Sequence, residues 1–267
     1  MPEGPEVKRV VDFLSTFEGK HLHKVSILSG RYERHGPFVG FNKLKETLPL
    51  KISSVNCQGK FIYFYFANDT SLWCTLGMSG AWRRKREKHA RVKFVIDKEV
   101  VYFDDVRNFG TLKYVSEMQL LATKLSKLGP DPLKRDLIPE ILTPNLKKRG
   151  GKTIAEVMMD QSVIAGIGNY LKAEILYASN ISPHRLCSSL SDKELSKICK
   201  NTNEIMRRSY ESGGATIMSY RDENGNPGTF SRRFAVYNQA QDPLGNTVIR
   251  ETTKDKRTTH WVPEVQV

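Results

Sequence analysis

The sequence has few cysteines and lacks the spacing that would give them a structural role. There are four, Cys57, Cys74, Cys187 and Cys199, and no pair shows the C-x-x-C pattern of a zinc site. Four cysteines in 267 residues also argue against a disulfide framework and favour a reducing compartment. We therefore expect no bound metal and no other cofactor.

Long apolar runs are missing as well. No stretch approaches the ~20 apolar residues that a membrane-spanning helix needs. No charged-then-apolar leader is visible at the start. We expect an intracellular protein that has no membrane partner, and the chain contains no internal repeats.

Negative charge is scarce relative to positive charge. Lysine and arginine number 42 and aspartate and glutamate 29, a net charge of +13. Residues 1–120 carry 20 basic and 13 acidic residues, and the remainder carries 22 and 16, so both halves are positive. Such a distribution favours a polyanion, and nucleic acid above all, lying between or across two basic lobes.

The first six residues, MPEGPE, contain two prolines and a glycine, which predict an extended lead-in of fixed shape. Removal of Met1 would leave Pro2 with a free secondary amine. Such a group titrates near pH ~7.7–8.0, so part of it is neutral and nucleophilic. With the Glu3 carboxylate beside it, Pro2 is a candidate Schiff-base nucleophile. The alternative is a frayed terminus, with Glu6 placed in the first turn of a helix.

Hydrophobic periodicity predicts one helix and then a series of strands. Apolar residues at 7, 10, 11, 14 and 17 form a helical stripe. Short strands follow at 21–28, 51–56, 61–66, 71–76, 90–96 and 100–103, a spacing typical of a sandwich or barrel. The 83–89 segment between them is a basic loop, suited to phosphates or simply solvated.

Four turn residues between these strands stand out. The Lys60 ammonium can point into a cleft, and Met78, Arg107 and Phe109 are candidates for a wedge in a base stack. Lys60 lies at a hairpin tip, Met78 stands between two glycines, and Arg107 and Phe109 share a turn. Exposed side chains of these types can fill the gap left by a displaced nucleotide. The alternative places Met78 and Phe109 in the core and pairs Arg107 with a neighbouring aspartate.

From residue 116 the pattern becomes helical. Helices are predicted at 154–161, 169–178 and 191–211, and glycines at 166 and 168 permit a close approach of the backbone. The free N–H groups of the helix that Asn169 opens could bind a phosphate. The polar loop 215–231 reads as too irregular to pack, and so as functional or mobile. Residues 234–237, 248–249 and 258–262 predict a β-hairpin that carries Arg257.

The order of these parts resembles the formamidopyrimidine-DNA glycosylase/endonuclease VIII family of base excision repair enzymes, over nearly the whole chain. The segments that carry the resemblance are MPEGPEV at 1–7, GKF at 59–61, LGMSG at 76–80, EKH at 87–89, RNFG at 107–110, LGPDPL at 128–133 and AGIGNYLKAEI at 165–175.

The resemblance implies a role for each matching residue. Pro2 would attack C1′ of the damaged nucleoside, Glu3 would shuttle protons, and Lys60 would assist catalysis. Met78, Arg107 and Phe109 would fill the space of the everted base. The residues that would grip phosphates are His89, Lys152, Asn169 and Arg257, with Arg257 also counted as catalytic. Glu6 and Glu174 would have supporting roles.

The C-terminal segment departs from the family pattern, because most members end in a four-cysteine zinc finger. Here Val262 and Val265 stand where the last two cysteines would be. This resembles the zincless finger of the endonuclease VIII-like 1 branch. We expect no structural zinc, and we expect Trp261, Val248 and Ile249 to pack the hairpin instead.

The expected fold class is α+β. It comprises an antiparallel β-sandwich flanked by helices at 1–127, a linker at 128–135, a helix–two-turns–helix domain at 136–232 and a zincless-finger hairpin at 233–267. The implied protein is a monomer located wherever the genome lies (nucleus, cytoplasm or viral factory).

The implied activity is that of a bifunctional glycosylase/lyase on damaged double-stranded DNA, or on single-stranded or bubble DNA. It would cleave the strand by β- or β,δ-elimination. Oxidised pyrimidines, hydantoins and formamidopyrimidines are the favoured bases. The loop at 216–230 resembles a lid for 8-oxoguanine and keeps a specificity for 8-oxoguanine and formamidopyrimidine open. Two hypotheses of a different class are a non-catalytic damaged-DNA-binding protein and an RNA-binding module.

Overall fold

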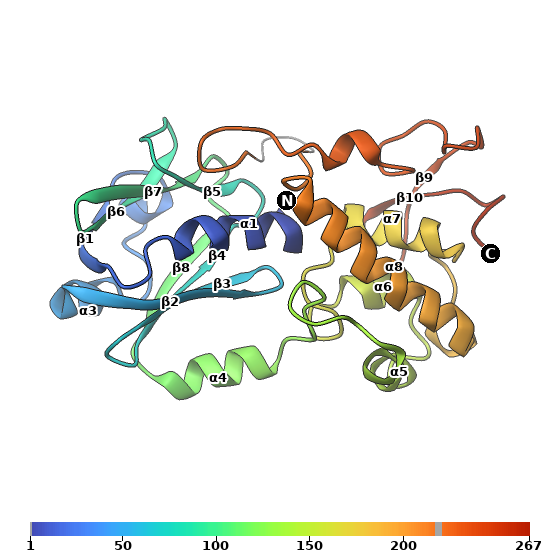
Figure 1. The fold of residues 1–267 in the computed structure, drawn as a ribbon, viewed down its shortest axis with the longest axis horizontal. Coiled ribbons are helices and arrows are strands. Elements are labelled where there is room, and N and C mark those ends of the chain that lie inside the picture. Colours follow the sequence, from blue (N-terminus) through green and yellow to red (C-terminus); the bar gives the residue numbers. More distant parts are fainter. Residues whose placement is uncertain (1, 217–220) are drawn as a thin grey trace. The chain divides into compact units, whose positions relative to one another are not determined.

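The computed structural model describes residues 2–216 and 221–267, which form two compact units. The first unit holds Pro2 and residues 6–127, 213–216 and 221–228, and the second holds 3–5, 128–212 and 229–267. In Figure 1 the strands of the first unit run from blue to green and the long helices of the second from green to orange. Among the described residues no helix has the length and apolar character needed to cross a bilayer.

The first unit is built on eight antiparallel strands in the order β5-β7-β6-β1-β2-β3-β4-β8. Phe64 on β3 and Trp82 on β5 are far apart in this order, yet their ring centroids lie 5.5 Å apart. The sheet therefore folds into two facing layers, as the predicted sandwich requires. The strands are β1 His21–Ile27, β2 Leu50–Gln58, β3 Phe61–Phe66, β4 Ser71–Thr75, β5 Gly80–Arg83, β6 Ala90–Ile96, β7 Glu99–Asp105 and β8 Thr111–Val115.

Helix α1 (Gly4–Ser15) covers this sandwich with the predicted apolar stripe. Val7 and Leu14 are buried, as is Phe17 just beyond its end. Residues 31–47 also contain helices that periodicity did not reveal, because they are too short to show a repeat. The remaining helices of the unit are α2 Arg31–Arg34, α3 Phe41–Thr47 and α4 Met118–Ser126.

The second unit is helical, with one small hairpin. Its two clearest helix starts are capping boxes, in which Thr153 and Ser191 exchange hydrogen bonds with a glutamate three residues later. The three predicted helices are confirmed, and α5 was missed. The elements are α5 Pro139–Lys147, α6 Ile154–Met159, α7 Asn169–Ser179, η1 Cys187–Ser189, α8 Asp192–Glu211, η2 Phe230–Arg233, β9 Ile249–Thr252 and β10 Thr258–Trp261.

Two segments of the C-terminal region differ from the expectations in their main-chain structure or packing. Residues 234–237 form no strand, because their main chain turns to meet a buried carboxylate, described below. The loop at 215–231 does pack in part, since Ala215 and Phe230 are each 3% exposed. Residues 217–220 of this loop, like Met1, lie outside the described residues. The predicted α+β fold class is confirmed.

The hairpin packs through valines at and near the positions where the family pattern has cysteines. Val236, Val248 and Val262 form a buried cluster with Ala173 of α7, and Val265 packs against it. Val248 therefore packs as expected. Ile249 does not, because it is 39% exposed on the outer edge of β9.

Candidate functional site

The sequence-predicted residues fall into two sets, one in each unit. The first unit holds Pro2, Glu6, Lys60, Met78, His89, Arg107 and Phe109, and the second holds Glu3, Lys152, Asn169, Glu174 and Arg257. Each set has its own geometry, and the peptide bond between Pro2 and Glu3 joins them covalently. Both of these residues are buried.

Glu3 is held by the N-terminus of α7. Its carboxylate accepts hydrogen bonds from the N–H groups of Gly168 at 2.7 Å, Tyr170 at 3.0 Å and Leu171 at 3.3 Å. The positive end of a helix is a favourable place for a carboxylate. The expectation that these N–H groups bind phosphate is therefore wrong, because an internal carboxylate occupies them.

Glycine makes this contact possible. A Cβ added at Gly168 would lie 2.3 Å from the Glu3 carboxyl carbon, so no other residue fits there without displacing the carboxylate. The Gly4 N–H also donates to the Gly166 carbonyl at 2.8 Å. The close approach predicted for the 166–168 turn is thus an approach to the N-terminal segment.

A second carboxylate, that of Glu6, fixes the end of the N-terminal segment 1–6. It lies in the first turn of α1 and accepts the Ala215 N–H at 2.7 Å. A Cβ added at Gly214, where φ is +85°, would come within 2.8 Å of the same carboxylate oxygen. The N-terminal segment is therefore shaped by two carboxylates that hold main-chain N–H groups.

In the first unit the three wedge candidates stand at exposed tips. Met78 is 39% exposed and Phe109 is 53% exposed, so neither is a core residue. The Arg107 guanidinium stacks over the Phe109 ring, 5.0 Å from its centroid. A Cβ added at Gly77 would lie 2.6 Å from the Phe109 carbonyl carbon, so the two loops adjoin. Lys60 is half-buried in the turn between β2 and β3.

Asp105, which sequence reasoning treated only as a possible partner of Arg107, holds these two loops together. Its carboxylate is 1% exposed and accepts the Ser79 hydroxyl at 2.6 Å, the Gly110 N–H at 2.7 Å and the Arg107 N–H at 3.2 Å. The exposed tips therefore project from a backbone that one buried acid fixes.

The basic loop at 83–89 faces residues 221–225 across a pocket of about 560 Å³. The Arg83 guanidinium donates to the carbonyl oxygen of Arg221 at 2.7 Å and also to that of Asp222. His89 lines the same pocket, and its Nδ1 lies 3.3 Å from an Arg91 guanidinium nitrogen. The loop thus presents several cations beside His89, an arrangement suited to phosphate.

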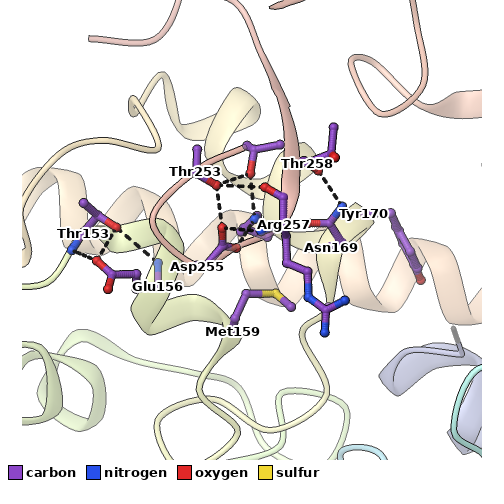
Figure 2. A network of polar contacts seen from close by, with 12 residues as sticks. Thr153, Glu156, Met159, Asn169, Tyr170, Thr253, Asp255, Arg257 and Thr258 are labelled. Carbon is purple, nitrogen blue, oxygen red and sulfur yellow. Dashed lines mark hydrogen bonds and ion pairs between the residues drawn. The ribbon is translucent and has the colours of Figure 1, made fainter. Parts of the chain in front are cut away.

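In the second unit, Asn169 and Arg257 belong to one polar network (Figure 2). The Asn169 side-chain amide donates to the Thr258 carbonyl at 2.8 Å, which ties α7 to the hairpin next to Arg257. Arg257 itself is exposed, as is Lys152. The Thr153 N–H contributes most to a lowered pKa of Glu156, and Lys152 and Lys254 also contribute, so both lysines lie near that carboxylate.

Glu174 explains the absence of a strand at 234–237. Its carboxylate accepts the N–H groups of Ala235, Val236 and Tyr237 at 2.8, 3.0 and 2.8 Å. Burial raises the pKa of Glu174, and the three N–H donors oppose that rise. The Glu174 side chain therefore connects the middle of α7 to the segment that precedes the hairpin.

Sequence reasoning also missed Lys172 and Asp255. Lys172 is completely buried and pairs with Asp255 within the hairpin turn. The one signal in the sequence was a lysine at an otherwise apolar position of α7, between Leu171 and Ala173.

Three family models match the chain. The formamidopyrimidine-DNA glycosylase N-terminal domain matches residues 1–112, the H2TH domain 128–221 and the C-terminal domain 228–267. Formamidopyrimidine-DNA glycosylases of Ureaplasma parvum and Listeria monocytogenes are each 31% identical to the chain, and each match covers 100% of both proteins.

Solved structures of formamidopyrimidine-DNA glycosylases are also similar to this chain. The MutM (Fpg) protein of Thermus thermophilus superposes with a TM-score of 0.87 at 30% identity, covering 99% of this chain and 98% of that one. A Lactococcus lactis Fpg bound to DNA with an abasic site gives a TM-score of 0.85 at 26% identity, covering 99% of each chain.

Proposed function

The chain belongs to the formamidopyrimidine-DNA glycosylase family, and from this premise we propose that it is a base excision repair glycosylase that removes oxidised bases from damaged double-stranded DNA. The observation that carries the proposal is the Glu3 carboxylate. It sits one residue after Pro2 and is fixed by three main-chain donors. Such preorganisation suits a group that must transfer protons at a defined place.

The proposed mechanism uses the Pro2 amine after removal of Met1. Its lone pair attacks C1′ of an everted nucleotide, and the bond between C1′ and the base breaks as the leaving base takes up a proton. The Pro2 nitrogen then loses its proton, and the C1′–O4′ bond breaks as Glu3 passes a proton to O4′, which opens the sugar and leaves a C1′ iminium on Pro2. The resulting iminium acidifies the C2′ proton. Loss of that proton expels the 3′ phosphate, so strand cleavage follows as β-elimination, or as β,δ-elimination if the 5′ phosphate also leaves.

The exposed tips of the first unit fit the same reaction. A base must leave the duplex before Pro2 can reach C1′, and the empty space must be filled. Met78, Arg107 and Phe109 are proposed to fill it. His89, Lys152, Asn169 and Arg257 are proposed to hold the flanking phosphates, and Lys60 to assist near the reacting sugar.

Formamidopyrimidines are the proposed first substrates, because the favoured specificity and its alternative both include them. Relatives bear the name formamidopyrimidine-DNA glycosylase, and one Lactococcus lactis Fpg complex contains Fapy-dG DNA. Oxidised pyrimidines and hydantoins come next, with 8-oxoguanine as the competing choice. Matched duplexes that differ only in the lesion would rank these bases by kcat/KM.

Borohydride trapping on a duplex with one abasic site tests the mechanism. We expect a covalent adduct that mass spectrometry locates on the Pro2 peptide, with Met1 absent. Pro2→Thr should abolish the adduct and base excision while DNA binding survives.

Wild-type turnover by Pro2→Thr would refute the assigned nucleophile. No adduct from the wild-type protein, with tight binding to abasic DNA, would instead support a non-catalytic damaged-DNA-binding protein.

A further inference from the structure

The turn that carries Arg257 is closed by its own main chain. The Thr253 N–H donates to the Arg257 carbonyl at 3.1 Å, and the Lys256 N–H donates to the Thr253 carbonyl at 2.8 Å. Lys256 has a φ of +60°, in the left-handed region that a lysine seldom adopts without a constraint. Arg257 is the last residue of this turn, so the conformation of the turn sets where its side chain starts.

Asp255 supplies the constraint from inside the turn. Its side chain is only 3% exposed. One carboxylate oxygen accepts the Thr253 hydroxyl at 2.5 Å and the Arg257 N–H at 3.2 Å. The Arg257 side chain extends away from this carboxylate, while its main chain takes part in the network (Figure 2).

Lys172 of α7 completes the network. Its side chain is 0% exposed, and its ammonium pairs with the other oxygen of Asp255 and donates to the Thr259 hydroxyl at 2.8 Å. Burial lowers the pKa of Lys172, and Asp255 opposes that effect. A buried ion pair of this kind is weak evidence for added stability, and fixing one geometry is among its best-supported uses.

The helix that carries Lys172 also carries the contacts to Glu3. The first turn of α7 holds the Glu3 carboxylate, and Lys172, the residue after the donor Leu171, holds the Arg257 turn. We propose that Lys172 and Asp255 are a positioning pair that sets Arg257 at a fixed place relative to Glu3, without touching DNA themselves. The inference rests on the proposed phosphate contact of Arg257.

The salt dependence of DNA binding tests this pair. The probe is a duplex with a non-cleavable tetrahydrofuran abasic analogue, bound by the full-length protein. Each phosphate contact contributes about 0.9 to the slope of log K against log salt. We expect Arg257→Ala and Lys172→Met each to reduce the magnitude of this slope by about 0.9, the contribution of one phosphate contact. The double variant should have nearly the same salt slope as Lys172→Met alone, because Arg257 has already lost its phosphate contact in that variant.

Asp255→Asn separates positioning from simple charge. Removing a negative charge should strengthen DNA binding if only long-range electrostatics matter. Loss of positioning predicts the reverse, a weaker complex with a smaller salt slope. Because a misplacement of about 1 Å can cost about 100-fold in rate, kcat/KM for excision should fall about 10- to 100-fold. This nearly isosteric variant also carries the test if Lys172→Met does not fold.

Arg185→Met is the matched control. It removes a partly buried ion pair with Glu194, 3.0 Å long, in the same unit. It should lower thermal stability and leave the salt slope unchanged.

Each outcome bears on one statement. An unchanged slope in Arg257→Ala would refute the phosphate contact and, with it, the inference. A reduced slope in Arg257→Ala with unchanged slopes in Lys172→Met and Asp255→Asn would refute the positioning pair alone. If the two substitutions lower the salt slope independently, so that their reductions add in the double variant, the positioning pair is also refuted. Borohydride trapping tests the proposed catalysis separately from either result.

Discussion

The two units present their candidate residues in opposite ways. In the first, Met78 and Phe109 stand exposed at loop tips, and the buried acid Asp105 fixes the backbone beneath them. In the second, buried charges are linked through one helix, and Arg257 is an exposed member of the network. An exposed tip can change its chemistry at small cost to folding, whereas a member of a buried network cannot.

This contrast separates two kinds of evidence for a site. Exposed side chains that gather on adjoining loops, as Met78, Arg107 and Phe109 do, form a patch of the kind that marks an interaction site. A carboxylate surrounded by main-chain donors indicates fixed geometry, and Glu3, Glu174 and Asp105 all have this environment. Substitutions in the two units should therefore differ in how far activity and stability change together.

The largest effect is expected for Gly168→Ala in the second unit. The added Cβ would lie 2.3 Å from the Glu3 carboxyl carbon, so the carboxylate must move. A shift of about 1 Å at a reacting group can cost about 100-fold in rate. We expect kcat/KM to fall by about that factor while binding to abasic DNA changes little. Gly151→Ala is the control, because its added Cβ meets nothing within 4 Å. Normal excision by Gly168→Ala would mean that Glu3 needs no fixed position.

The buried His260 gives the stability of the protein a pH dependence. Burial lowers its pKa to about 4, and neither ring nitrogen has a hydrogen-bond partner among the described residues. The unfolded imidazole titrates near pH ~6.5, so protonation favours the unfolded state as pH falls below that value. The stabilisation is complete above pH ~6.5 and is lost towards pH 4, about 3 kcal/mol in all.

Chemical denaturation at pH 7 and pH 5 measures this effect. His260→Gln should lose less stability than the wild type between these two values. Equal losses in both proteins would show that His260 does not titrate as its burial indicates.

Asp105→Ala extends the comparison to the buried part of the first unit. It leaves the buried N–H of Gly110 and the Ser79 hydroxyl without their carboxylate partner. A buried donor that loses its partner costs about 1–3 kcal/mol. We expect about 2 kcal/mol less stability in urea denaturation, together with slower excision because both tips lose their support. A change under 0.5 kcal/mol would show that the loops hold their shape without Asp105.

The smallest effect on stability is expected for Phe109→Ala. The ring is 53% exposed, so its removal should change the free energy of unfolding by no more than about 0.5 kcal/mol. Excision should nevertheless fall, because the space of an everted base would be filled less well. Thermal melts and single-turnover excision on one sample separate the two readouts. A large stability loss with unchanged excision would make Phe109 a structural residue.

Local patterns predicted much of the fold. Short runs of β-branched and aromatic residues between turns placed most of the first unit's strands, and the pattern of apolar residues placed helices α6, α7 and α8. Such local patterns do not reveal a side chain, distant in the sequence, that binds the N–H groups of a segment. Residues 234–237 alternate like a strand, but their N–H groups bind Glu174, sixty or more positions earlier. Ile249 likewise looked like a packing residue and lies on an exposed edge.

The sequence by itself determined which candidate functional groups the protein has, because residue type and short spacing are local properties. These groups include the Pro2–Glu3 dipeptide, the loop residue Met78 and the excess of positive charge. Only the tertiary structure decided which buried groups meet. The glycines at 166 and 168 signalled a close approach, and the fold alone identified Glu3 as the group that approaches. Lys172 and Asp255 lie 83 residues apart, and no local rule predicts that a buried lysine finds its carboxylate there. Long-range pairing depends on the packing of α7 against the hairpin, which sequence periodicity does not record.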